Sequence, residues 1–144
     1  IIKNKALREK FQTYASANEM DQGHLFAFIG VAAAYGNGTE WLDQMLDYVQ
    51  GKIDYTDDFF RKHMPCIKVI RPQASYLIFL DCRELNLPQD ELVRLFVEGA
   101  HLALNDGTMF GKEGTGFMRL NVATPRAVLR QAFLQLHTAY ESLK

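Results

Sequence analysis

A glycine-rich stretch between two short apolar runs constrains this chain more than any other part of its sequence. The runs are Leu102–Leu104 and Phe117–Val122, and the glycines between them are Gly107, Gly111, Gly114 and Gly116. Such runs predict two strands joined by a loop, because glycine adopts backbone angles that other residues resist. We therefore expect a sheet in this half of the chain.

An arginine lies in the middle of the second predicted strand. Arg119 stands between Met118 and Leu120, and it points to the opposite face of the strand because side chains alternate along a strand. A guanidinium among apolar neighbours is costly to bury unless a carboxylate or phosphate meets it. That anion is either a ligand or an internal partner, for which Asp81 at the end of the YLIFLD run is the candidate.

Composition excludes several classes of function. The 144 residues are 48% hydrophobic with a net charge of −1, which is typical of a soluble globular protein. Lysine and arginine do not cluster among aromatic residues, so we expect no nucleic-acid partner. The longest apolar run, Leu25–Tyr35, is too short to span a bilayer. Cys66 and Cys82 lack metal-ligand spacing and are expected to be free thiols in the cytoplasm, although they could pair if they met.

The first half of the chain reads as helical. Asn4 is predicted to cap a helix that ends near Ala17, and Thr39 to cap a long helix over residues 40–63. Between them, His24–Tyr35 is apolar on every side, as expected of a helix that is packed on most of its circumference. This helix is either the heart of a helical subdomain or packs against a neighbour outside the chain, and we expect the second arrangement.

The second half alternates strands and helices. Strands are predicted at Cys66–Ile70 and Tyr76–Asp81, and a helix after Leu87-Pro88. The two strands around the glycine loop follow, and Thr124-Pro125 begins a last helix. The predicted inner stripe of this last helix is Val128, Leu129, Ala132, Phe133, Leu136 and Tyr140. The order predicts an α/β fold of the α+β kind, in which helices pack on a small mixed sheet.

Candidate groups other than Arg119 have ordinary structural interpretations. No histidine lies in a catalytic pattern, and Asp54, Asp57 and Asp58 predict a solvated helix face rather than a metal site. The glycine spacing is not that of a phosphate-binding loop, because no helix follows it. None of these groups forms a catalytic, phosphate-binding or metal-binding pattern, so we expect no such site from them.

The beginning of the chain is unusual. It opens with Ile1-Ile2, without an initiator methionine and without a signal or transit peptide. We therefore expect it to be a piece of a longer polypeptide.

Three stretches together carry a resemblance to a known family. They are NDGTMFGKEGTGFMRLNVATP (residues 105–125), QASYLIFLDCREL (73–85) and AAAYGNGTEWLDQMLDYV (32–49). In this order they resemble the C-terminal part of pyridoxal-phosphate enzymes of fold type I, the class I/II aminotransferases, and within them the MalY/PatB type of cystathionine β-lyase. The resemblance covers essentially the whole chain.

The resemblance implies roles for particular residues. Arg119 would hold the α-carboxylate of an amino-acid substrate, and the wall of the active site would include Asn105, Gly107, Phe110 and Gly111. Residues 1–38 would be a remnant of the large cofactor-binding domain, residues 39–64 an interdomain helix and residues 65–144 the small C-terminal domain. The parent enzyme would be a cytoplasmic homodimer.

The resemblance also implies what the chain lacks. The family's Schiff-base lysine lies upstream of the matching region, so pyridoxal 5′-phosphate would belong to the parent, and this piece would be inactive alone and could self-associate. Aminotransferase and C–S lyase remain equal alternatives for the parent. Two other interpretations stay open: a free-standing α/β module that binds a small anion or a partner, and a degenerate relative kept as a structural subunit.

Overall fold

The computed structural model describes residues 1–143, and the chain divides into two compact units, Ile1–Gln44 and Met45–Lys144. The first unit contains α1 (Lys5–Ala17), α2 (Leu25–Asn37) and the first residues of α3 (Thr39–His63). The predicted cap of α1 is confirmed, because the Asn4 side chain accepts a hydrogen bond from the Leu7 backbone N–H at 3.0 Å.

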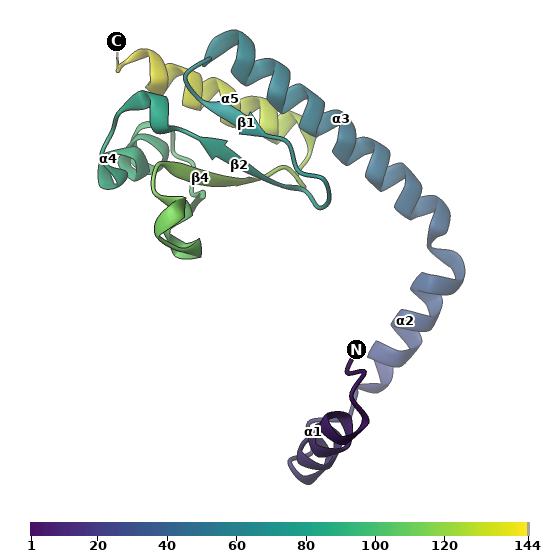
Figure 1. Ribbon diagram of the computed structural model, residues 1–144. Helices are drawn as coiled ribbons and strands as arrows, with labels where there is room; N and C mark the ends of the chain where they lie inside the picture. The colour runs from purple at the N-terminus through teal and green to yellow at the C-terminus, as the bar shows by residue number, and fades with distance from the viewer. Residues whose placement is uncertain (144) are drawn as a thin grey trace. The chain divides into compact units, whose positions relative to one another are not determined.

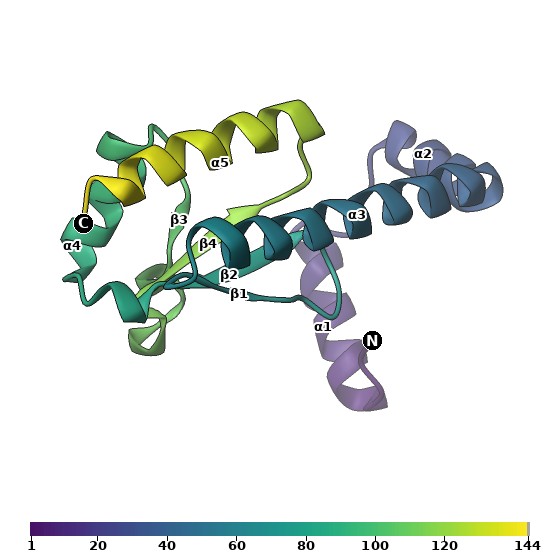
Figure 2. The same cartoon turned by 90° about the horizontal axis from the view of Figure 1, so that it is seen from above.

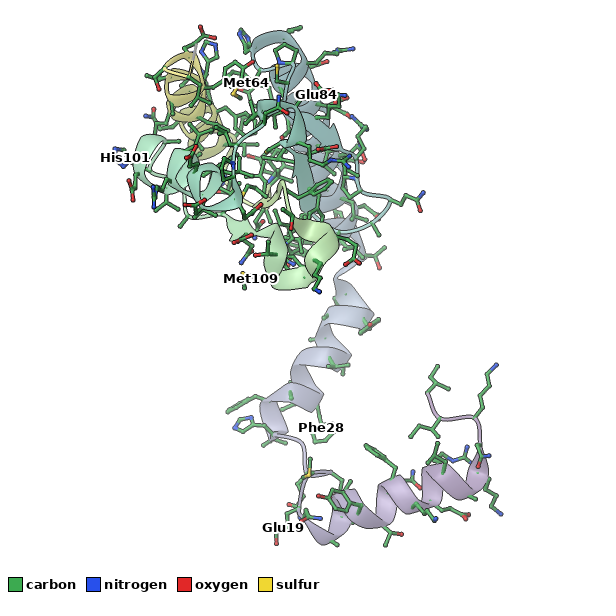
Figure 3. The ribbon with its side chains drawn as sticks, turned by 60° about the vertical axis from the view of Figure 1, so that its left-hand side comes forward. Glu19, Phe28, Met64, Glu84, His101 and Met109 are labelled. Atoms are coloured by element: carbon green, nitrogen blue, oxygen red, sulfur yellow. The ribbon has the colours of Figure 1, made fainter. Side chains whose placement is uncertain are left out.

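Helix α2 has no buried residue within its own unit. Its large apolar side chains are exposed, with fractions from 56% for Ile29 to 87% for Tyr35. Figure 3 shows the Phe28 side chain on this helix. Its ring lies close to Gly23, in the segment before the helix. The alternative in which this helix is the heart of a helical subdomain is therefore wrong, because nothing in the first unit encloses it.

The second unit begins within α3 and adds a sheet, short helical turns and a final helix. The strands are β1 (Lys68–Ile70), β2 (Leu77–Asp81), β3 (Asn105–Asp106) and β4 (Phe117–Asn121). The helical segments are η1 (Arg83–Leu85), α4 (Gln89–Arg94), η2 (Leu95–Gly99), η3 (Gly107–Phe110), η4 (Lys112–Gly114) and α5 (Arg126–Glu141). No helix within residues 1–143 is long and apolar enough to cross a membrane.

The four strands form one sheet in the order β1-β2-β4-β3. Strands β2 and β4 pair along their whole length, from Leu77 opposite Asn121 to Asp81 opposite Phe117. The predicted class, helices packed on a small sheet, is confirmed. All three pairings are antiparallel, so the sheet itself is not mixed; the short connection from β1 to β2 makes a hairpin, which permits only an antiparallel pair.

Helices α3 and α5 cover one face of the sheet (Figure 1). The glycine loop, residues 107–116 between β3 and β4, lies on the other face. The view in Figure 2 shows the same two helices in front of the strands. The rings of Tyr55 on α3 and Phe133 on α5 stack with centroids 5.7 Å apart. The covered face of the sheet supplies Ile78, Leu80, Met118 and Leu120, all of them buried.

Two predicted positions are wrong. The strand before the glycine loop lies at Asn105–Asp106, not at Leu102–Leu104. The Leu102 N–H donates to Phe96 O at 2.8 Å and the Leu104 N–H to Leu102 O, so this run bonds to the preceding helical turn instead of to β4. Strand β1 likewise starts at Lys68, because the Ile67 N–H closes a turn onto Met64 O.

The inner stripe of α5 needs a similar correction. Val128 is 55% exposed, and Ala132 is half-buried. The buried residues of α5 begin one position further on, at Leu129, and they include Ala139, which the sequence did not indicate. Residues spaced three and four apart from Leu129 share its face, whereas Val128 turns toward solvent.

Candidate substrate-carboxylate site

Arg119 is placed by strand register on the face of the sheet that is turned away from α3 and α5. Its neighbours across the strands are Phe79 on β2 and Asn105 on β3. Because Met118 and Leu120 point into the core, Arg119 points away from α3 and α5. This alternation was predicted and is confirmed.

Two side chains fix the guanidinium. Its Nη2 donates a hydrogen bond to Asn105 Oδ1 at 2.9 Å. The Phe110 ring lies on its face, with the Cζ atom 4.3 Å from the ring centroid. Phe110 is itself held edge-on against Phe79, with centroids 5.6 Å apart. Of the residues predicted for the site wall, the structure thus brings Asn105 and Phe110 into contact with Arg119.

The predicted alternative, an internal salt bridge between Arg119 and Asp81, is wrong. Asp81 pairs with Arg83, whose Nε and Nη2 donate to its two carboxylate oxygens at 2.9 and 2.7 Å. The hydrogen bond from Arg83 holds the pKa of Asp81 below its ordinary value. Within residues 1–143, Arg119 has no ion pair with a carboxylate.

One buried donor of the guanidinium has no partner. Arg119 Nε is buried and has no hydrogen-bond acceptor among the described residues. A buried donor without an acceptor costs about 1–3 kcal/mol, and such groups in native proteins call for a specific explanation. Because its hydrogen bond to Asn105 leaves its charge without a carboxylate partner, the guanidinium is suited to an anion that does not come from the described chain.

The glycine loop is held in place by close backbone contacts. A Cβ atom at Gly107 would lie 2.2 Å from Gly114 O, so the loop cannot accept a side chain there. Gly111 has a φ of 124°, in the region that favours glycine. Figure 3 shows Met109 on this loop, which carries Phe110 toward the sheet.

Sequence reasoning missed the residue that ties the loop to the sheet. Gln89, the first residue of α4, donates from Nε2 to Asp106 Oδ1 and accepts from the Gly116 N–H at Oε1, both at 2.7 Å. Asp106 also accepts from the Thr108 N–H at 2.8 Å. No motif marks Gln89, because its contacts depend on how α4 meets both ends of the loop.

The remaining candidate groups make ordinary contacts. Asp54 and Asp57 both pair with Arg71, and no group of three or more metal-binding side chains is found in residues 1–143. The rings of His63 and His137 lie edge to face across α3 and α5, with centroids 5.4 Å apart. Cys66 and Cys82 are free thiols, as predicted.

Comparison with known proteins places this geometry among pyridoxal-phosphate enzymes. The chain is 32% identical over 139 residues to cystathionine β-lyase PatB of Bacillus subtilis (strain 168), a match that covers 96% of this chain and 36% of PatB. It is 29% identical to protein MalY of Escherichia coli (strain K12), over 100% of this chain and 37% of MalY. No protein-family model matches it.

A solved structure gives the same result. Cystalysin from Treponema denticola, which contains a pyridoxal 5′-phosphate cofactor, matches with a TM-score of 0.90 and 26% identity. The match covers 100% of this chain and 36% of cystalysin. The chain therefore spans a little over a third of the length of the proteins it resembles.

Covalent attachment of that cofactor requires a lysine amine that is free to form an imine. Lys52 is the buried lysine of residues 1–143, and its Nζ is engaged by Thr124 O at 3.0 Å and by the Tyr48 ring at 4.1 Å. At Arg119, by contrast, the described residues leave a guanidinium without a carboxylate partner.

Proposed function

The chain is related over almost its whole length to cystathionine β-lyases of the MalY/PatB type, pyridoxal-phosphate enzymes of fold type I, and from this premise we propose that it serves as the C-terminal part of such an enzyme. The complete enzyme acts on amino acids, either as a C–S lyase or as an aminotransferase. The observation that supports this most directly is Arg119, whose guanidinium has no carboxylate partner in the described chain.

In this proposal Arg119 binds the α-carboxylate of the substrate. A planar fork with parallel N–H donors fits a carboxylate bidentately, and the compact ammonium of lysine does not replace it well. The pyridoxal phosphate of the complete enzyme supplies the electron sink for bond cleavage, while protein groups orient the substrate. Asn105, Gly107, Phe110 and Gly111 form the wall beside the bound carboxylate.

The rest of the chain has a packing role. We propose that residues 1–38 belong to the large domain, residues 39–64 to an interdomain helix and residues 65–144 to the small domain. The exposed apolar surface of α2 is then covered by the remainder of the enzyme, a cytoplasmic homodimer. On its own, the chain binds no cofactor covalently and is inactive.

A chimera tests the proposed function. The matching 139 residues of PatB are replaced by this chain, and cleavage of cystathionine is measured alongside transamination between an amino acid and a keto acid. We expect activity in one assay, and Arg119→Lys should raise KM and lower kcat/KM by about tenfold or more through the lost bidentate contact.

The controls separate the alternatives. Arg83→Lys changes an arginine that already has a carboxylate partner and should leave KM near that of the parent chimera. A folded, cofactor-loaded chimera whose kinetics are indifferent to Arg119→Lys would contradict the proposal. Such a result would favour a free-standing module that binds a small anion.

A further inference from the structure

Arg119 differs from the paired surface arginines in the chemistry of its partner. Arg61, Arg71, Arg83 and Arg94 each form an ion pair with a carboxylate. Arg119 instead donates to the side-chain amide of Asn105. An amide oxygen accepts the same hydrogen bond as a carboxylate oxygen but carries no net charge, so this contact orients the guanidinium and leaves its charge uncompensated.

The Asn105 amide is oriented from two sides. Strand register sets its backbone directly opposite Arg119. Its Nδ2 contacts Met109 Sδ at 4.0 Å, while its Oδ1 accepts from the guanidinium. The side chain therefore presents its oxygen, and not its NH₂ group, to Arg119.

The second constraint acts on the face of the guanidinium. Phe110 covers one face at 4.3 Å from Cζ, and the edge-on contact with Phe79 holds that ring in place. A cation over an aromatic face is attracted by the ring quadrupole, again without a compensating charge. The plane of the fork is thus fixed by uncharged groups alone.

From this arrangement we propose that Asn105 and Phe110 are positioning residues that aim Arg119 at a ligand carboxylate without neutralising it. The inference rests on the proposed function, in which Arg119 binds the carboxylate of an amino acid. It adds a specific requirement, which is that the residue at position 105 must be a neutral hydrogen-bond acceptor.

The decisive variant is Asn105→Asp. It keeps the size and the accepting oxygen of asparagine but adds a negative charge beside Arg119. An opposite charge at this distance changes the equilibrium for charging a neighbouring group roughly ten- to a thousandfold, so the new carboxylate competes with a ligand carboxylate for Arg119. We expect carboxylate affinity to fall about tenfold or more, while the stability of the chain is unchanged or higher. A purely structural role for Asn105 would instead couple any loss of binding to a loss of stability.

The experiment is a titration of the purified chain with L-alanine, followed through the Arg119 Nε–H signal in ¹H–¹⁵N spectra. L-Alaninamide, which lacks the carboxylate, is the ligand control, and urea unfolding of each variant gives stability. Asn105→Ser removes most of the orienting contact without adding charge, and Phe110→Leu removes the ring. Both should weaken binding less than Asn105→Asp does.

The outcomes separate this inference from the proposed function. If Arg119→Lys abolishes L-alanine binding and Asn105→Asp weakens it at full stability, both stand. If Arg119→Lys abolishes binding but Asn105→Asp binds as the parent chain does, the positioning role is overturned and the proposed function remains. If Arg119→Lys has no effect, or the parent chain does not distinguish L-alanine from L-alaninamide, the carboxylate site itself is overturned.

Discussion

Cys82 shows how burial in this core controls the chemistry of a single residue. The thiol is 2% exposed, and its Sγ lies 3.6 Å from Leu80 O. Burial, with a smaller contribution from the charge of Asp81, raises the pKa of Cys82 to about 12. The folded chain therefore holds this proton more tightly than the unfolded chain does.

A pH dependence of stability follows from the raised pKa of Cys82. A group with a raised pKa in the folded state stabilises that state fully below its ordinary pKa, which is 9.0 here, and this stability is lost as pH rises toward about 12. We expect the free energy of unfolding in urea to fall as pH rises from about 9 toward about 12, and Cys82→Ala to reduce that fall. Tyr140, whose pKa is raised to about 12 by its hydrogen bond with Cys66 and by burial, should keep part of the alkaline loss in the variant. An equal fall in both proteins would contradict the assignment to Cys82.

The candidate site was predictable at one residue and unpredictable at its neighbours. Arg119 is marked by a charge inside an alternating strand, a pattern that the sequence displays directly. The partner of Arg119 is not marked, because Asp81, the carboxylate that the sequence suggests, pairs with Arg83 two residues away. The orienting role of Asn105 depends on the β3–β4 register. The sequence does not indicate this register, because it predicts the strand at Leu102–Leu104, whose N–H groups donate to Phe96 and Leu102 instead of to β4.

At the scale of the element, α5 shows how finely its packing face is defined. Leu129 is 1% exposed and its neighbour Val128 is 55% exposed, although both were predicted to face the core. Adjacent helix residues differ by about 100° in direction, so a stripe inferred from apolar residues alone is uncertain by one position at its edge.

Alanine substitutions at these two neighbours provide a matched test of the α5 face. Leu129→Ala should lower the free energy of unfolding by about 2–5 kcal/mol through a core cavity. Val128→Ala should change it by no more than about 0.5 kcal/mol, because its side chain is largely in solvent. Urea unfolding of both variants measures the difference. Comparable losses at the two positions would show that the helix face is rotated from the one described.

The glycine loop is the element with the least tolerance for a side chain. At Gly107 a Cβ atom would meet Gly114 O at 2.2 Å and Phe117 O at 2.6 Å, and both are backbone atoms that cannot rotate away. Gly51, within α3, has nothing within 4 Å of the same position. Substitution by alanine should therefore have opposite effects on stability at Gly107 and at Gly51.

Gly107→Ala should destabilise the chain by about 1–3 kcal/mol or more and should displace Phe110 from Arg119. Gly51→Ala should stabilise it by about 1 kcal/mol, since alanine is the better helix former. Urea unfolding measures both, and the Arg119 Nε–H signal reports the displacement. A Gly107→Ala chain with the parent's stability and an unshifted signal would mean that the loop is not packed as described.

For the molecule as a whole, the two units differ in how they bury apolar surface. The second unit has a continuous core between the sheet and its helices, and its class was predictable because strand and helix signals alternate clearly. The first unit buries only Ala15, while α2 consists largely of apolar residues. Large contiguous apolar surfaces on soluble proteins mark contacts with another protein surface, and sequence alone does not say which surface covers this one.

We expect the purified chain to self-associate through the exposed apolar side chains of α2. We expect its sedimentation coefficient to rise with concentration, because contact between copies removes the α2 side chains from water. The double variant Phe26→Glu/Ile29→Glu places charges on α2, where the parent residues are 72% and 56% exposed, and should stay monomeric over the same range. Met109→Glu changes a residue that is 68% exposed in the second unit and should associate as the parent does. A parent chain that is monomeric at every concentration would show that α2 is covered within the chain itself, which would also remove the reason to assign it a contact with a larger enzyme.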